Sequence, residues 1–204
     1  MHHILLYENK KLETFLSKIY GIPYINTYIS NEKQDAMDLI EELSYPFVSK
    51  ISPSSGSVGV ELVYTKRQAQ KIIRQVFSQT GRKTHNVYSR QKNYIYFQDY
   101  IPNDGYDIRA IVVGNMAFGY YRRVPDGDFR ASGMNRVEMR GLPGEVIKLA
   151  RKINKVIKSP QLVIDMLHST DENYYINEFS PICQMEDQQQ LLVDGVAGVY
   201  VFDD

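Results

Sequence analysis

Two β-rich runs that flank a short polar segment constrain this chain more than any other stretch. The runs are residues 162–167 (Leu-Val-Ile-Asp-Met-Leu) and 174–180 (Tyr-Tyr-Ile-Asn-Glu-Phe-Ser), and the segment between them is His-Ser-Thr-Asp-Glu-Asn. β-Branched and aromatic residues on both sides of a polar, turn-forming stretch are typical of a β-hairpin with a longer loop. The chain is therefore expected to contain an antiparallel pair here.

The centre of that turn decides which side chains share a face. With the turn centred between residues 171 and 172, paired positions have a constant sum, so Asp165 lies opposite Glu178 and Val163 opposite Ser180. Opposed Cβ atoms lie about 5 Å apart, and like charges there are destabilising, so a cation is expected between the two carboxylates. Oxygen ligands that leave room for water and phosphate favour Mg²⁺. A register shifted by one residue would instead leave a solvated hairpin.

Composition narrows the classes of partner and compartment. The 204 residues suffice for one domain or two small lobes, and acidic and basic residues are equal at 24 each. This balance gives no broad footprint for nucleic acid or an anionic membrane, although it leaves room for a local basic cluster. Cys183 is the only cysteine, which fits a reducing, cytoplasmic compartment. No apolar run approaches the ~20 residues of a membrane span, and no signal-peptide pattern opens the chain.

Apolar periodicity predicts helices in four places. Residues 8–20 carry an apolar stripe, residues 31–43 a second one, and Thr65 with Gln68 forms a capping box for a helix that runs to about residue 79. The fourth helix opens at Pro143 and closes before Pro160. The stripe of the first helix is Leu12, Phe15, Leu16 and Ile19.

A hairpin with a hydroxyl-rich tip is expected between the second and third helices. Its strands are residues 46–51 and 58–64, and Lys50 stands at a strand end directly before the Gly/Ser tip. Backbone N–H groups in such a tip are good phosphate ligands, and the lysine supplies charge. The tip lacks the Gly-Lys-Ser/Thr of a P-loop.

A second hairpin is predicted from residues 107–113 and 116–123, joined by Gly114-Asn115. It follows a strand over residues 94–101 and a turn over 102–105. Residues 82–93 and 124–137 lack a period and are expected to be loops. The hairpin register puts one mixed set on a single face: Asp107, Arg109, Phe118, Tyr120 and Arg122. This face is either part of a site or an exposed surface on which Asp107 pairs with Arg122.

The order of these elements resembles the ATP-grasp superfamily, specifically the branch of ribosomal-protein glutamate ligases and glutathione synthetases, over nearly the whole chain. The resemblance implies a two-lobed α+β fold with antiparallel sheets and the nucleotide held between the lobes. It implies a first helix and connector over residues 1–27, a small lobe over 28–97 and a large lobe over 98–204. The resemblance also implies that the N-terminal domain that normally precedes the ATP-grasp region is absent, and we expect that either the chain is truncated or another chain supplies that domain.

The resemblance also assigns nucleotide-binding roles. Asn9-Lys10 resembles the start of the helix whose lysine reaches the nucleotide, and residues 45–50 resemble the strand that bears the second lysine. Residues 54–60 resemble the phosphate-covering loop, residues 97–101 the strand that holds adenine through its backbone, and Asp107 the aspartate near ribose. The implied ATP-binding set is Lys10, Lys50, Ser55, Gly56, Ser57, Asp99, Tyr100, Ile101 and Asp107.

Catalytic and metal-binding roles follow from the same resemblance. It implies that Arg109, Arg122 and Arg130 stabilise phosphate or acyl phosphate, and that magnesium binds at Asp165, Glu178 and Ser180. The family usually has Asn where this chain has Ser132 and Ser180. A serine hydroxyl is a weaker ligand on a shorter side chain, so the second magnesium is expected to be held loosely or through water.

The implied function is an ATP- and magnesium-dependent ligase that joins a carboxylate to an amine through an acyl phosphate. Its partners are small-molecule or peptide carboxylates and amines, without nucleic acid or membrane, in a homo-oligomer or with a separate N-terminal domain. Two alternatives remain: an ATP-binding module without ligase activity, which the serine substitutions favour, and a kinase that transfers phosphate to a hydroxyl. Fold analogy alone does not decide among them.

Overall fold

A computed structural model describes the chain except for residues 1–4, 8, 53, 55–56, 85–87, 132–135, 183–191, 194–195 and 204. The chain forms two compact units. The larger unit comprises residues 1–24 and 102–204, and the smaller unit residues 25–101. The first helix therefore belongs to the same unit as the C-terminal half, whereas the divisions expected from the sequence were 27/28 and 97/98.

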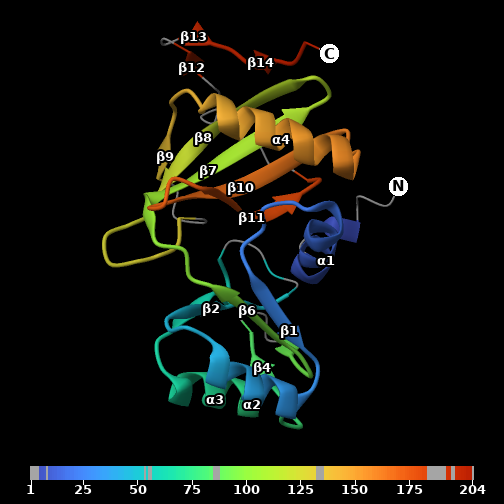
Figure 1. Cartoon of the computed structure of the whole chain (residues 1–204), viewed down its shortest axis with the longest axis vertical. Helices are drawn as coiled ribbons and strands as arrows, with labels where there is room; N and C mark the ends of the chain where they lie inside the picture. Colours follow the sequence, from blue (N-terminus) through green and yellow to red (C-terminus); the bar gives the residue numbers. More distant parts are fainter. Residues whose placement is uncertain are drawn as a thin grey trace. The chain divides into compact units, whose positions relative to one another are not determined.

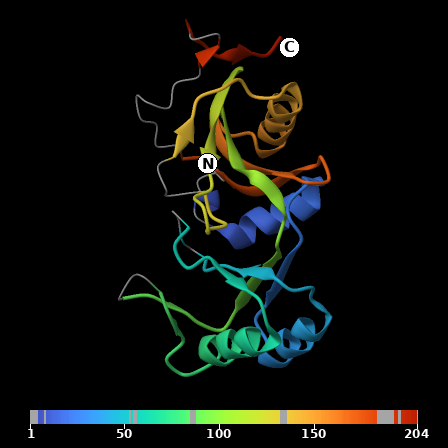
Figure 2. The same ribbon diagram turned by 90° about the vertical axis from the view of Figure 1, so that its left-hand side faces the viewer.

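The larger unit is a sheet covered on one face by helix (Figures 1 and 2). Its strand order is β11-β10-β7-β8-β14, with β9 paired to β8, and all these pairs are antiparallel. The elements of this unit are α1 Lys10–Tyr20, β7 Asn103–Val113, β8 Met116–Arg123, β9 Val137–Glu138, α4 Gly144–Ile157, β10 Gln161–Ser169, β11 Tyr174–Ser180, β12 Leu192–Val193, β13 Val196–Ala197 and β14 Tyr200–Val201.

Strand alternation gives this sheet two different faces. Ile108, Ala110, Leu162 and Ile164 point toward α4 and form the main core with its buried stripe. The neighbouring positions point the other way and carry a smaller apolar cluster of Ile111, Tyr120 and Val163, together with the predicted polar set. We call this second surface the polar face. The registers Asp107↔Arg122 and Arg109↔Tyr120 confirm the shared face predicted from the Gly114-Asn115 turn.

The hairpin of β10 and β11 pairs as expected at one end only. Asp165 lies opposite Glu178 and Val163 opposite Ser180, which confirms the predicted register there. Beyond Asp165 the register shifts, because Met166 pairs with Ile176 and β11 accommodates an extra residue, Asn177. The constant-sum pairing up to the turn was therefore wrong. This bulge lets both Ile176 and Phe179 enter the core, although an odd spacing puts two residues on opposite faces of a regular strand.

The smaller unit is an antiparallel sheet of order β1-β6-β2-β3, with two helices on one face and a separate β4-β5 ladder (Figure 1). Its core joins Ile40 of α2, Phe47 of β2, Ile73 of α3 and Phe97 of β6. The Thr65–Gln68 capping box forms as predicted. The bounds are β1 Thr27–Ser30, α2 Lys33–Glu42, β2 Phe47–Ser49, β3 Glu61–Val63, α3 Lys66–Val76, β4 Arg82–Lys83, β5 Arg90–Gln91 and β6 Ile95–Asp99.

Three expectations about individual segments were wrong in whole or in part. Of the stripe of the first helix, Leu12 and Leu16 pack against the core, whereas Phe15 is 53% and Ile19 71% exposed. Residues 103–105, predicted as a turn, begin strand β7, with Gly105 at φ 83° and its N–H donating to the Asn103 side chain. The connector over residues 82–93 holds the β4-β5 ladder, because Arg82 bonds Glu61 and pairs across to Gln91.

No helix among the described residues is long and apolar enough to cross a bilayer.

Candidate active site

A buried ion-pair network occupies the polar face of the larger unit. Arg109 donates from Nε and Nη2 to the two Asp165 oxygens, each at 2.8 Å, and Arg122 Nη2 lies 2.8 Å from Asp165 Oδ2. Arg122 also donates to both oxygens of Asp107 at 2.6 Å. The network runs over β8, β7 and β10, whose registers bring these four side chains together. The structure thus places the predicted pair of Asp107 and Arg122 inside the protein, rather than on an exposed surface.

The network shifts the pKa values of its two aspartates in opposite directions. Burial disfavours the charged form of Asp165, but Arg109 and Arg122 outweigh it and hold its pKa well below the usual range. Burial has the larger effect on Asp107, whose pKa rises to about 6 even though Arg122 opposes the change. Asp165 consequently stays ionised at neutral pH, which is the state that a metal or a cationic partner requires.

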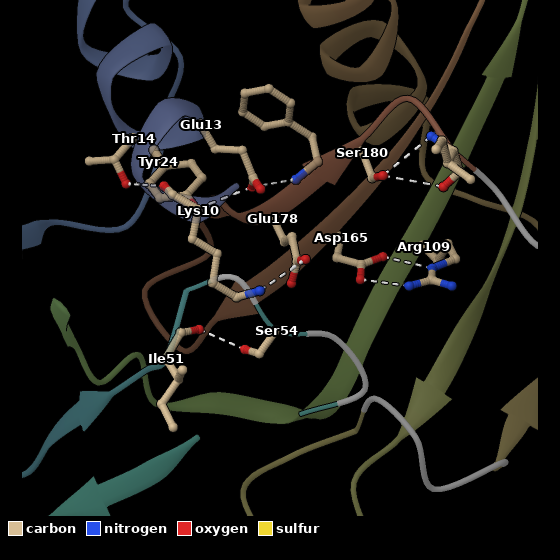
Figure 3. Close-up of polar contacts among 12 residues, drawn as sticks. Lys10, Glu13, Thr14, Tyr24, Ile51, Ser54, Arg109, Asp165, Glu178 and Ser180 are labelled. Carbon is tan, nitrogen blue, oxygen red and sulfur yellow. Dashed lines mark hydrogen bonds and ion pairs between the residues drawn. The ribbon is translucent and has the colours of Figure 1, made fainter. Parts of the chain in front are cut away.

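Glu178 lies opposite Asp165 but has its own cation. Lys10 Nζ is 3.2 Å from Glu178 Oε1, and Lys10 is only 3% exposed (Figure 3). The cation that the opposed carboxylates require is supplied by the protein in this structure, as arginine on one side and lysine on the other. Counting Asp107 as well, three carboxylates face three cationic side chains, so the group is neutral as a whole.

Helix α1 holds Lys10 in place through a polar buried face. Glu13 Oε2 accepts the N–H of Phe179 at 3.0 Å, on the strand that carries Glu178. Beyond the helix, Ile176 N donates to Pro23 O at 2.8 Å. The polar character of this buried helix face was not predicted from the sequence. Its residues nevertheless recur at helical spacing, just as those of the apolar stripe do: Lys10, Glu13, Thr14 and Ser17.

The donor set suits a metal that shares its ligands with another molecule. The opposed Asp165 and Glu178 present carboxylate oxygens, and Ser180 lies one step along the same face of β11. The described residues contain no group of three or more His, Cys, Asp or Glu that would cage an ion. Mg²⁺ commonly binds through one or two carboxylates plus substrate phosphates, so these residues fit it. The Ser180 hydroxyl also bonds the Ile182 backbone, accepting from its N–H at 3.2 Å.

Arg130 lies in the loop after β8. Asp128 holds it through two bonds, Nε to Oδ1 at 3.0 Å and Nη2 to Oδ2 at 2.8 Å. The Arg130 side chain is 34% exposed, and its guanidinium has further N–H groups beyond these two. Ser132, two residues after Arg130, lies outside the described part of the chain.

In the smaller unit, Lys50 directly follows β2, close to the predicted strand end, and it is buried, with only 5% exposed. Its backbone N–H donates to Tyr96 O at 3.0 Å. The two residues after it are also buried. Tyr94 fixes this segment, because its hydroxyl accepts the N–H of Ser52 at 2.9 Å and donates to Ser52 O. The base of the predicted loop is therefore held inside the unit.

The loop itself turns through two left-handed residues. Ser57 has φ 59° and Gly59 φ 70°. A Cβ at Gly59 would collide with the Ile51 side chain, so only glycine fits at this position. Ser55 and Gly56, which the family resemblance assigned to ATP, lie outside the described residues. Gly59 was predicted only as part of the loop, and its glycine requirement was missed.

The remaining predicted nucleotide residues lie at the end of β6. Asp99 is the last residue of that strand, and its Oδ2 accepts from Asn26 Nδ2 at 3.0 Å. Tyr100 and Ile101 follow it and are partly exposed. Two important side chains had no local sequence signal: Tyr94, and Gln91, which donates to Lys50 O and Tyr94 O. Ser52 and Lys50 are distant from them in sequence, and Gln91 itself lies in the segment predicted to be a loop.

Comparisons with known proteins agree on one family. The model of the RimK-like ATP-grasp domain matches residues 3–197. A glutamate–LysW ligase, ArgX of Sulfolobus acidocaldarius, is 29% identical over 180 residues, which cover 81% of this chain and 58% of the relative. An α-aminoadipate–LysW ligase, LysX of Saccharolobus solfataricus, is 26% identical over 86% of this chain and 62% of its own length. The chain thus spans about three fifths of the length of these two curated relatives.

Among solved structures, a D-alanine–D-alanine ligase from Bacillus anthracis superposes with a TM-score of 0.63 at 20% identity, covering 90% of this chain and 60% of that one. At this identity the likeness establishes the fold and not the activity. The antiparallel two-unit α+β architecture and the family match over most of the chain agree with the resemblance drawn from the sequence. The chain belongs to the RimK-like ATP-grasp family.

Proposed function

We propose that this chain is the ATP-binding and catalytic region of a magnesium-dependent ligase that joins a carboxylate to an amine, working in the cytoplasm. The observation that carries the proposal is the polar face, where Asp165 opposes Glu178 and both are neutralised by Arg109, Arg122 and Lys10. Cations for phosphates and carboxylates for magnesium are the parts that phosphoryl transfer requires. The curated relatives, themselves named as ligases, support the choice of reaction.

The residues divide the work as follows. Lys10 and Lys50 contribute charge to the nucleotide phosphates. The segment from Asp99 to Ile101 meets the base, and Asp107 the ribose. Asp165, Glu178 and Ser180 would hold magnesium, which would supply positive charge to the phosphates. Ser55, Gly56 and Ser57 supply loop contacts to phosphate.

The chemistry needs no side-chain nucleophile. A substrate carboxylate oxygen attacks the γ-phosphorus as the bond to the ADP oxygen breaks, which yields an acyl phosphate. An amine nitrogen then attacks the acyl carbon, loses a proton and expels phosphate, leaving an amide. Arg109, Arg122 and Arg130 stabilise the charge that spreads over the transferring group, as preorganised cations do. The substrates that we propose are an amino-acid or peptide carboxylate and an amine.

Substitution of Glu178 tests the proposed magnesium site most directly. Glu178→Gln keeps the shape and the acceptor oxygen of the side chain but removes its charge, and Glu138→Gln makes the same change at an exposed surface pair with Arg140. Calorimetry with ATP is expected to show strong magnesium dependence in the native chain and the surface variant, and little in Glu178→Gln. Lys50→Ala is expected to lose most of the affinity for the nucleotide itself. A folded native chain that binds no ATP would refute the proposal.

A second candidate, a nucleotide-binding module without ligase activity, is favoured by one observation. Ser180 stands where the family pattern has a metal-ligating Asn, and its hydroxyl is engaged by the Ile182 backbone. ADP release on adding amino acids or peptides together with an amine separates the two. Release that requires both substrates supports a ligase. ATP binding without release supports the module, and phosphate transfer to a hydroxyl would indicate a kinase.

A further inference from the structure

A groove with an apolar floor and a basic rim lies between α4 and the C-terminal strand β14 of the larger unit. Its volume is about 610 Å³. Apolar side chains form its floor, and four cationic side chains form its rim. None of the described residues that line it is Asp or Glu. The floor residues are Ile147, Val156, Tyr200 and Phe202. We call this feature the α4 groove.

Both walls of the α4 groove are fixed by hydrogen bonds. The Leu142 N–H donates to the Tyr200 hydroxyl at 2.9 Å, just before α4 begins, and Phe202 N donates to Asn115 O at 2.9 Å in the β7-β8 turn. The Arg151 guanidinium lies over the Phe202 ring, 4.1 Å from its centre. The groove is therefore part of the folded unit and is not a gap beside a loose tail.

The rim is a concentrated basic stripe on a chain with zero net charge. Lys148, Arg151, Lys152 and Lys155 follow the i, i+3, i+4, i+7 spacing of one helix face and extend about 10 Å along α4. Among the residues that the structure describes, no carboxylate pairs with Lys148, Lys152 or Lys155, and these three lysines are exposed. Like charges so close repel one another, and an anionic partner would relieve that repulsion.

The α4 groove is separate from the candidate active site. Helix α4 packs on the core face of the sheet, through Val146, Ala150 and Ile153. Asp165 and Arg109 project from the opposite face. A ligand in the groove therefore does not compete with a nucleotide at the polar face.

We propose that the α4 groove binds an acidic peptide segment that inserts an aromatic or aliphatic side chain. The rim is longer than one carboxylate, and an extended peptide advances about 3.3 Å per residue, so three or four residues span it. The apolar floor takes the side chain, while the lysines and Arg151 meet flanking carboxylates. The protein partner or substrate that carries this segment is thus held at a distance from the reacting groups.

The probe is a fluorescein-labelled peptide of two glutamates, a phenylalanine and two further glutamates, and binding is read by fluorescence anisotropy without nucleotide. Peptides with glutamine for glutamate, or alanine for phenylalanine, test the two parts separately, and each is expected to bind about tenfold more weakly. Affinity is expected to fall as salt is raised. Because no nucleotide is present, the result does not depend on the proposed ligase activity.

Charge reversal identifies the groove as the site. Lys148→Glu/Lys152→Glu is expected to weaken binding by at least about tenfold. Lys33→Glu/Lys71→Glu, which changes the net charge equally at exposed positions of the smaller unit, is expected to leave binding unchanged. Lys148→Gln/Lys152→Gln, with an intermediate loss, serves if the reversed variant does not fold.

Three results would overturn the proposal: equal losses in both charge-reversed variants, no preference for phenylalanine, or no binding at all. Vesicles of phosphatidylcholine with phosphatidylserine provide the remaining comparison. Binding to vesicles that depends on Lys148 and Lys152, together with indifference to the peptide, would make the groove a membrane contact and the peptide proposal wrong.

Discussion

At the scale of single residues, buried charge is what distinguishes this protein. Asp165 is 7% exposed, yet it accepts hydrogen bonds from Arg109 on the adjacent strand β7 and forms an ion pair with Arg122 on β8. Removing one member of such a network leaves the others buried without a counter-charge, which costs far more than a surface pair is worth. The network therefore contributes to stability as well as to the proposed binding of metal. Substituting Asp165 and measuring stability at several pH values isolates the contribution to stability.

Asp165→Asn is expected to lower the free energy of unfolding by about 3 kcal/mol or more at pH 7, because Arg109 and Arg122 lose their shared carboxylate. The folded-state pKa of Asp165 lies below its usual value of 3.8. The stabilisation is therefore fully present above that value and is lost as pH falls toward the folded-state pKa. Urea unfolding at a series of pH values is expected to show the gap between native and variant shrinking below about pH 4. A gap that stays constant would contradict this account.

Tyr94→Phe tests whether the phosphate loop is anchored at its base. The change leaves the Ser52 N–H and C=O without the hydroxyl that bonds both, a cost of about 1–3 kcal/mol for buried groups. We expect ATP affinity to fall about tenfold in calorimetry, while the unit stays folded. Tyr64→Phe, at a 60% exposed position, is the matched control and is expected to bind normally. Equal affinities in the two variants would mean that Ser52 does not position the loop.

At the scale of elements, α1 and β11 depart most from sequence rules. The buried face of α1 is polar because it meets polar groups of β11: Glu13 accepts the Phe179 N–H, and Lys10 pairs with the Glu178 side chain. β11 changes face at Asn177 so that Ile176 enters the core while Glu178 stays on the polar face. Both departures bring Lys10 to Glu178.

Glu13→Ala and Phe15→Ser test this account of α1. Glu13→Ala removes a buried acceptor and is expected to cost about 1–3 kcal/mol of unfolding free energy. Phe15→Ser alters an apolar residue that is 53% exposed, and is expected to change stability by no more than about 0.5 kcal/mol. Denaturant unfolding of both variants decides the matter. A larger loss of stability in Phe15→Ser than in Glu13→Ala would mean that the apolar stripe, and not the polar face, is the packed face of α1.

At the scale of the whole molecule, two separate cores account for the two units. One core joins α4 to the large sheet, and the other joins α2 and α3 to the small sheet. Each unit thus has its own hydrophobic stabilisation, and units of this kind open with different free energies.

Ile73→Ala is expected to loosen the smaller unit selectively. Ile73 is fully buried in α3, and truncating it leaves a cavity that costs about 2–5 kcal/mol. Native-state hydrogen exchange is expected to accelerate in α2, α3 and β6, while the strands β7 and β10 keep their protection. Ile153→Ala, an equally buried site in α4, provides the mirror control with acceleration in the larger unit. Uniform acceleration across both units would show that the chain unfolds as one.

The sequence by itself determined the elements whose signals are local. The Thr65–Gln68 box begins α3, Gly114-Asn115 sets the register of β7 and β8, and polar residues between two β-rich runs place Asp165 opposite Glu178. Capping, tight turns and strand period act over a few residues, so they can be recognised without the fold.

Only the tertiary structure decided which cations pair with the buried carboxylates and which side chain holds the segment after β2. Arg109 and Arg122 reach Asp165 across strands that are far apart in the chain, Lys10 reaches Glu178 across 168 positions, and Tyr94 clamps Ser52. A bulge at Asn177 likewise depends on the core that Ile176 enters. Such contacts depend on side chains brought together by packing, and their energies come from burial that no local pattern contains.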